Sequence, residues 1–135
     1  MISTLKSETK PIYSQADIVY ARQTVRDWAI QSQFGIVDQT KIITAASELA
    51  RNAFEYGKGG TMLIEALTDG IRKGLRLTFE DKGPGIPNME LALTDGYTTG
   101  GGLGMGLTGA RRLVNEFDIQ SKVGEGTRVT IVKWK

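Results

Sequence analysis

The spacing of hydrophobic residues predicts two long helices in the first half of the chain. Residues 15–34, QADIVYARQTVRDWAIQSQF, repeat apolar side chains at helical spacing, with Ser14 as N-cap, Asp17 three residues later and Gly35 as the stop. Residues 39–56, QTKIITAASELARNAFEY, predict a second helix, capped by Asp38 and ended by Gly57. Its apolar residues share one broad face, which we expect to pack on a sheet: Ile42, Ile43, Ala46, Leu49, Ala50, Ala53 and Phe54.

The second half of the chain alternates strand and helix patterns. Residues 61–67 and 75–81 read as strands joined by TDGIRKG, whose Asp-Gly pair favours a hairpin turn. Residues 117–123 and 128–134 predict a closing hairpin around GEGT. Between the hairpins we expect a short helix after Asn88 and a longer one over residues 104–116. Two hairpins and two or three helices predict an α+β fold: a two-layer sandwich with a mostly antiparallel sheet, helices on one face, and residues 1–135 as a single domain.

Composition narrows the chemistry that this chain can perform. The 135 residues include no cysteine and no histidine, so disulfides, thiolate nucleophiles, histidine-based triads and phosphohistidine are excluded. The 17 basic and 15 acidic residues are mixed along the chain, which gives no reason to expect a nucleic-acid partner. No run of about 18 apolar residues predicts a membrane span. We therefore expect a cytoplasmic protein whose acid–base chemistry relies on carboxylates.

The segment ELARN, residues 48–52, combines a carboxylate and an amide on one helix face. Glu48 and Asn52 are four residues apart and lie nearly opposite the apolar stripe, so both are expected to project away from the core. A carboxylate can take a proton from a nucleophile, and an amide oxygen is a ligand for Mg²⁺. The alternative is an ordinary polar helix surface. Glu55 shares this face, so spacing alone does not decide which glutamate acts as base.

Two glycine-rich segments complete a candidate nucleotide site. In DKGPGIP, residues 81–87, Asp81 follows a strand and can accept a hydrogen bond from an exocyclic amine. Gly83 and Gly85 would let a flat ring approach the backbone, although the same segment could be a simple surface turn. In TTGGGLGMGLTGARRL, residues 98–113, several glycines precede a helix whose free N–H groups favour a polyphosphate.

Three common nucleotide motifs do not account for these glycines. GMGLTG, residues 104–109, fits the dinucleotide pattern G-x-G-x-x-G, but that pattern requires a strand immediately before it, and DGYTTGGG is not a strand. No glycine is followed by Lys and then Ser or Thr, so a Walker A loop is absent. The eukaryotic-type protein kinase motifs are also absent.

The segments ELARN, DKGPGIP, GLGMGL and GEGT, in this order and spacing, resemble the N box, the G1 and G2 boxes and the late threonine of GHKL (Bergerat-fold) ATPases. The resemblance covers essentially the whole chain. Within that superfamily, DGYTTGGGLGMGLTGARRLVNEF and the ending GEGTRVTIVKWK are most similar to the RsbT family of switch serine/threonine kinases in bacterial stress signalling, and less so to the related anti-sigma-factor kinases RsbW and SpoIIAB.

This resemblance implies a role for each matching residue. Glu48 would be the general base, Asn52 the Mg²⁺ ligand, Asp81 the adenine acceptor and Thr127 a second adenine contact. The residues expected to contact ATP are Asn52, Asp81, Gly83, Gly85, Ile86, Thr99, Gly101, Gly102, Leu103, Gly104, Met105, Gly106, Leu107 and Thr127. Arg51, within the N box, could contact a phosphate or pair with Glu55.

The resemblance also implies an activity. We expect an ATP- and Mg²⁺-dependent serine/threonine protein kinase of a partner-switching module, which phosphorylates a STAS-domain protein and also binds a phosphatase. A sensor histidine kinase is not expected, because the chain has no histidine and no dimerisation helix pair precedes the ATP site. The alternative is an anti-sigma factor or a nucleotide-gated binding module with little kinase activity.

Overall fold

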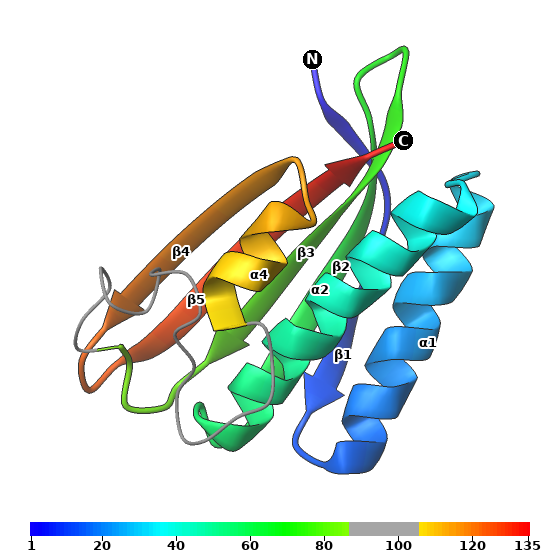
Figure 1. Cartoon of the computed structure of the whole chain (residues 1–135). Helices are drawn as coiled ribbons and strands as arrows, with labels where there is room; N and C mark the ends of the chain where they lie inside the picture. Colours follow the sequence, from blue (N-terminus) through cyan, green and yellow to red (C-terminus); the bar gives the residue numbers. More distant parts are fainter. Residues whose placement is uncertain (87–105) are drawn as a thin grey trace.

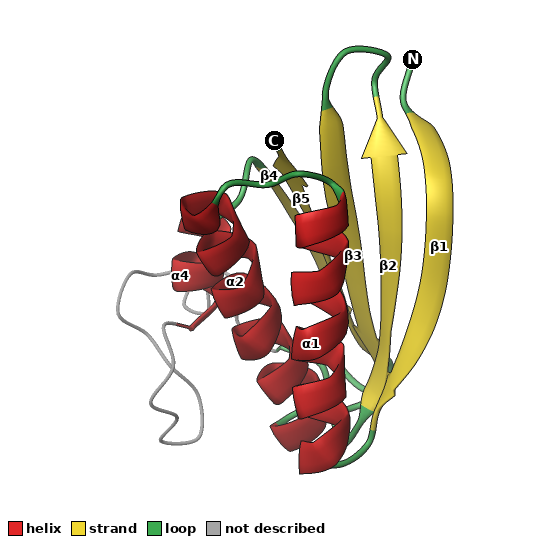
Figure 2. Cartoon of the chain, turned by 90° about the vertical axis from the view of Figure 1, so that its right-hand side faces the viewer, coloured by secondary structure: helices red, strands yellow, loops and turns green. Residues whose placement is uncertain are grey.

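The chain folds into one layer of strands and one layer of helices (Figures 1 and 2). The computed structural model describes residues 1–86 and 106–135. Within those residues a five-stranded sheet has the order β1-β2-β3-β5-β4, with every neighbouring pair antiparallel. The helices cover one face of this sheet, which confirms the predicted α+β sandwich. In chain order the elements are β1 (Ser3–Ile12), α1 (Gln15–Gln31), α2 (Ile36–Glu55), β2 (Gly60–Thr68), β3 (Lys73–Asp81), α4 (Gly106–Arg112), β4 (Glu116–Lys122) and β5 (Gly126–Trp134).

Helix α1 begins with the predicted cap. The Ser14 side chain accepts the backbone N–H of Asp17 at 3.0 Å, and the Asp17 carboxylate accepts the N–H of Tyr13 at 2.9 Å. The first bond satisfies a backbone donor that the first helical turn leaves unpaired, and the second holds the residue before the cap against the helix. The helix ends three residues earlier than predicted, because Gln33 adopts a left-handed backbone with φ of 66°.

Helix α2 starts earlier than predicted. Gly35 occupies the N-cap position and Asp38 lies within the first turn, so the predicted Asp38 cap is wrong. The Asp38 carboxylate instead lies 3.2 Å from the Lys133 ammonium of β5, which joins the helix layer to the sheet. The predicted apolar stripe is confirmed: its members are buried in the core or packed against it.

Both predicted hairpins form, and their inward side chains make the core. In β2 and β3, Ile64 lies opposite Leu77, and in β3 and β5, Leu77 lies opposite Ile131. All three side chains are fully buried beneath the helices. The turn between β2 and β3 uses the predicted Asp-Gly pair, with Gly70 at φ of 96°, a conformation that glycine adopts without steric cost.

The edge strand β1 was not predicted from the sequence. It pairs with β2 along its whole length, yet only Ile12 among its residues is buried. Its sequence, STLKSETKPI, has no alternating apolar pattern because most of its side chains face solvent. Lys6 packs its ammonium 4.2 Å from the centre of the Trp28 ring of α1, which attaches the strand to the helix layer.

Helix α4 is shorter than the predicted helix over residues 104–116. It ends at Arg112, and β4 begins at Glu116. The chain turns because the N–H of Asn115 donates to Val132 O at 2.9 Å and thereby joins the sheet. The short helix expected after Asn88 lies outside the described residues.

Candidate functional site

The candidate site brings together the C-terminal half of α2, the end of β3 and the start of α4 (Figure 1). Glu48 Oε1 accepts the backbone N–H of Gly106, the first residue of α4, at 3.0 Å. Just after the end of α2, Gly57 lies directly against the Asp81 side chain at the end of β3. Residues far apart in the sequence therefore converge as predicted.

The environment of Glu48 differs from the sequence-based expectation. Its side chain is only 8% exposed, whereas the helix face was expected to point away from the core. Helix α4 packs beside α2, and its first residue contacts this carboxylate. The second oxygen, Oε2, lies 3.3 Å from Nη1 of Arg51, one turn further along α2. Glu48 is thus a buried carboxylate with a different donor on each oxygen.

Asn52 lies on the same side of α2, one turn after Glu48, and is partly buried. Its backbone carbonyl accepts the N–H groups of Tyr56 at 3.0 Å and Gly57 at 3.1 Å, which ends the helix. The placement of Glu48 and Asn52 on one face of one helix agrees with the prediction.

Asp81 is the last residue of β3 and is partly buried. Its Oδ1 accepts the backbone N–H of Gly83 at 2.9 Å. Burial raises the pKa of the Asp81 carboxyl above its ordinary value of 3.8, and hydrogen bonds from the backbone of Gly83 and Thr127 oppose that rise. The carboxylate is held in place by short backbone contacts.

Gly57 is a site residue that sequence reasoning missed. It was interpreted only as the end of a helix, but a Cβ atom there would lie 2.5 Å from Asp81 Oδ2. A Cβ on Gly83 would in turn lie 2.6 Å from Gly57 Cα. Both positions require glycine because the loop after β3 packs directly on the end of α2. No local sequence signal distinguishes this requirement from a helix stop.

The remaining residues of the loop contact the β4–β5 hairpin. Gly85 has φ of 79°, and a Cβ on it would overlap the backbone of Lys122. The N–H of Ile86 donates to Ser121 Oγ at 2.8 Å, and that hydroxyl also lies 2.7 Å from Thr127 Oγ1. Thr127 is paired with Asp81 in the sheet register. The sequence did not indicate Ser121 as the residue that connects the loop to Thr127.

The predicted phosphate-binding segment is described only at its end. Gly106, with φ of 72°, and Leu107 begin α4. The other predicted residues of this segment, Thr99, Gly101, Gly102, Leu103, Gly104 and Met105, lie outside the described residues.

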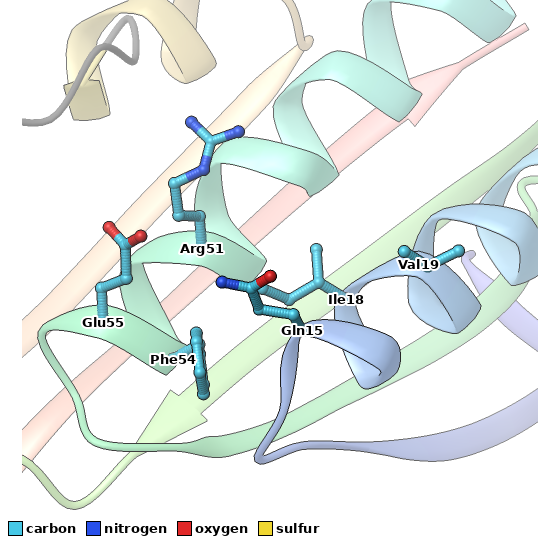
Figure 3. A pocket seen from close by; sticks show the side chains of 6 residues that line it. All are labelled: Gln15, Ile18, Val19, Arg51, Phe54 and Glu55. Atoms are coloured by element: carbon cyan, nitrogen blue, oxygen red, sulfur yellow. The ribbon is translucent and has the colours of Figure 1, made fainter.

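A groove of about 270 Å³ lies between the start of α1 and the second half of α2 (Figure 3). Its lining consists of Gln15, Ile18, Val19, Arg51, Phe54 and Glu55. Arg51 therefore borders this groove while its guanidinium also pairs with Glu48. The sequence did not decide whether Glu48 or Glu55 acts as the base. In the structure Glu48 contacts α4, whereas Glu55 lines the groove.

Comparison with known proteins identifies the class that this fold and site define. Residues 37–135 match the model of the histidine kinase-, DNA gyrase B-, and HSP90-like ATPase family. The chain belongs to this family, which is the GHKL superfamily that the sequence motifs resembled.

Its relatives narrow the class further. The chain is 48% identical to the serine/threonine-protein kinase RsbT of Bacillus subtilis over 91% of its own length and 92% of that protein. It is 35% identical to the anti-sigma F factor of Anoxybacillus flavithermus, over 84% of its length and 82% of that protein. Within the superfamily the chain is a serine/threonine-protein kinase of the RsbT group.

Solved structures share the fold. The RsbU and RsbW domains of Rv1364c from Mycobacterium tuberculosis match 96% of this chain and 33% of that chain, with a TM-score of 0.64 and 21% identity. The SiaB–SiaC complex from Pseudomonas aeruginosa matches 98% of this chain and 91% of that chain, with a TM-score of 0.57 and 10% identity. Within residues 1–86 and 106–135, no helix has the length and apolar character needed to cross a lipid bilayer.

Proposed function

We propose that this kinase transfers the γ-phosphoryl group of ATP to a serine or threonine hydroxyl of a STAS-domain protein, with Glu48 as the general base. The observation that supports the proposal most directly is the position of α2, which contacts α4 through Glu48 and the end of β3 through Gly57. These contacts place a buried carboxylate between the proposed adenine site and the helix that follows the phosphate-binding segment.

Glu48 has the chemistry that the transfer step needs. It would accept the acceptor's hydroxyl proton while the hydroxyl oxygen bonds to the γ-phosphorus. The bond from that phosphorus to the β,γ-bridging oxygen breaks, and ADP leaves with the electron pair. The backbone N–H of Gly106 donates to Oε1, and Arg51 Nη1 contacts Oε2. A carboxylate oxygen has two lone pairs, so the second lone pair of Oε2 would accept the proton of the hydroxyl.

Asp81 would bind the adenine amino group. The short contacts from Gly57 and Gly83 fix the position of this carboxylate, and the sheet register places Thr127 opposite it for a second adenine contact. Gly85 keeps the loop close to the hairpin, and Ile86 lies beside it. A fixed anionic acceptor distinguishes adenine, which presents an amine donor, from bases that present a carbonyl.

The metal-ligating side chains of the described residues suit a Mg²⁺ ion that is held mainly by the nucleotide. The described residues contain no group of three or more acidic or other ligating side chains that could hold a metal alone. Asn52 offers one neutral oxygen, and Mg²⁺ typically takes only one or two protein ligands alongside phosphate oxygens and waters. When bound, the ion would neutralise charge on the transferred phosphoryl group.

The partners follow from the proposed reaction. A STAS-domain protein supplies the hydroxyl, and a phosphatase is the second proposed partner, bound when the STAS protein is released. A cytoplasmic location suits such a module. The name of the relative from B. subtilis and its 48% identity support this assignment over other members of the superfamily.

Replacement of Glu48 by Gln tests the proposal. The amide keeps the shape and an oxygen that can accept the Gly106 N–H, but it cannot take a proton. We expect phosphate transfer to the co-encoded STAS-domain protein to fall about 100-fold or more, with the Kd for Mg-ADP changed less than about threefold. Intact-protein mass spectrometry and isothermal titration calorimetry provide these measurements. Unchanged transfer would remove Glu48 as the base.

A second function, nucleotide-gated binding without catalysis, is favoured by the relatives named anti-sigma F factor. It makes a different prediction for the same variant. A binding module should retain its complete effect on the STAS protein, or on a sigma factor, when Glu48→Gln has lost phosphate transfer. Pull-down of the partner in the presence of ATP and of ADP distinguishes the two functions.

A further inference from the structure

Arg51 is the described side chain that both pairs with the proposed base and borders the neighbouring groove. Nη1 lies 3.3 Å from Glu48 Oε2, and the Arg51 side chain is 45% exposed. Figure 3 shows Arg51 among the side chains that line the groove. The N–H of Gly106 holds the other oxygen of the same carboxylate at 3.0 Å. Two donors from different elements therefore contact the two oxygens separately.

We propose that Arg51 is a positioning residue for phosphoryl transfer, which orients the Glu48 carboxylate toward the incoming hydroxyl. This inference rests on the proposed role of Glu48. A carboxylate held at one oxygen can still rotate about its terminal bond, whereas contacts at both oxygens fix its plane. The acceptor must meet a lone pair of Oε2, and Arg51 determines where that lone pair points.

Two features support a positioning role over a purely structural one. The pair is formed by residues three apart on one helix, so its geometry is set by α2 itself. Nearly half of Arg51 is exposed, and pairs of this kind stabilise a fold only slightly. The guanidinium has five donors in a planar fork, so one can hold Glu48 while others stay available at the groove.

A positioning role and the phosphate contact considered from the sequence predict different effects on binding and catalysis. A phosphate ligand should affect binding of ATP more than binding of ADP, because the γ-phosphate is the group lost. A residue that acts through Glu48 should affect the rate of transfer and leave both affinities unchanged. The distinction is measurable as a change in kcat without a change in KM.

The test uses Arg51→Met, which keeps the apolar stem and removes every donor. At saturating Mg-ATP and co-encoded STAS-domain protein, we expect kcat to fall roughly tenfold to a hundredfold, with the KM for both substrates changed less than about twofold. Arg51→Lys should recover part of the rate, because an ammonium restores one donor to Oε2. Arg26→Met, at an exposed arginine of α1, serves as the matched control and should leave kcat unchanged.

The Glu48→Gln background provides the decisive comparison. If Arg51 acts through Glu48, adding Arg51→Met to Glu48→Gln should lower the residual rate no further. An equal additional loss in that background, or a KM for ATP raised tenfold with kcat unchanged, would overturn the inference in favour of a phosphate contact. If Glu48→Gln alone is fully active, the proposed role of Glu48 as base fails, and the role of Arg51 fails with it. If Glu48→Gln is inactive while Arg51→Met is fully active, only the role of Arg51 fails.

Discussion

At the scale of single residues, Asp81 combines a proposed role in adenine binding with a cost in stability. Its carboxylate is confined by Gly57, Gly83 and the backbone of Thr127, and burial raises its pKa. A raised pKa means that the folded state disfavours the ionised form. The ionised Asp81 carboxylate therefore lowers the free energy of unfolding. Such a destabilising charge is typical of a group retained for ligand binding.

The substitution Asp81→Asn should separate these two effects. We expect the Kd for Mg-ADP to rise about tenfold to a hundredfold, because a charge-assisted hydrogen bond to the adenine amine is lost. The midpoint of thermal unfolding without nucleotide should not fall at pH 7, because the buried charge is removed. Calorimetric titration and thermal scans measure both quantities. Retained micromolar ADP binding would contradict the adenine role.

The stability difference between Asp81→Asn and the wild type should depend on pH, and the raised pKa of Asp81 gives its direction. Because the folded pKa of Asp81 lies above the unfolded value near 3.8, ionisation destabilises the folded state. The destabilisation is absent below the unfolded pKa, grows as the pH rises through the folded pKa, and is constant above it. Any stability advantage of Asp81→Asn should therefore be largest near neutral pH and disappear at about pH 3.

At the scale of elements, one ion pair on the sheet face opposite the helices connects three strands. Arg76 of β3 donates to both oxygens of Glu65 of β2, at 2.8 and 3.0 Å, and Thr4 of β1 donates to the same carboxylate at 3.3 Å. The hydrogen bond from Arg76 lowers the pKa of Glu65 despite partial burial. A paired cross-strand charge of this kind stabilises the pairing of β2 with β3, and the Thr4 hydroxyl connects the edge strand to it.

We expect Glu65→Gln to lower the free energy of unfolding by about 1 kcal/mol at pH 7, measured by urea denaturation. A depressed folded pKa stabilises the protein above the unfolded value of 4.5 and loses this contribution as the pH falls through the folded value. The difference between variant and wild type should therefore close near pH 3. Glu125→Gln, which breaks the far more exposed pair with Lys122, is the control and should change stability little. Equal losses in both variants would contradict this account.

At the scale of the whole molecule, the helix and sheet layers are joined by a charge pair as well as by the apolar core. Lys133 of β5 points into the helix layer with only 9% of its side chain exposed, and Asp38 of α2 is its partner at 3.2 Å. A buried ammonium is costly unless it is paired. This pair explains why Asp38 serves the packing of layers and does not cap its helix.

Removal of the two partners should therefore have unequal effects. Asp38→Asn leaves the buried lysine without its anion and should cost about 1–2 kcal/mol, less than for a fully buried pair because a third of the Asp38 side chain is exposed. Lys133→Met removes the buried charge and should cost less. Urea denaturation at neutral pH compares them. Because Met keeps most of the apolar stem of lysine, a larger loss for Lys133→Met would contradict this account and show that the charge itself is net stabilising.

The sequence by itself determined the two long helices, both hairpins and the family motifs. Each of these depends on patterns within about 20 residues: apolar periodicity, turn chemistry and the order of glycine-rich segments. Glu48, Asn52 and Asp81 were proposed as site residues in this way, because a motif states which residues occur at which spacing.

Only the tertiary structure decided which neighbours those residues meet. The edge strand β1 has little apolar pattern and is defined by its pairing with β2. Glu48 is buried where α4 begins, and its contact with Gly106 spans 58 positions. The need for glycine at position 57 arises from Asp81. Local sequence does not encode such contacts, because each depends on where a distant segment comes to rest once the hydrophobic layers have packed.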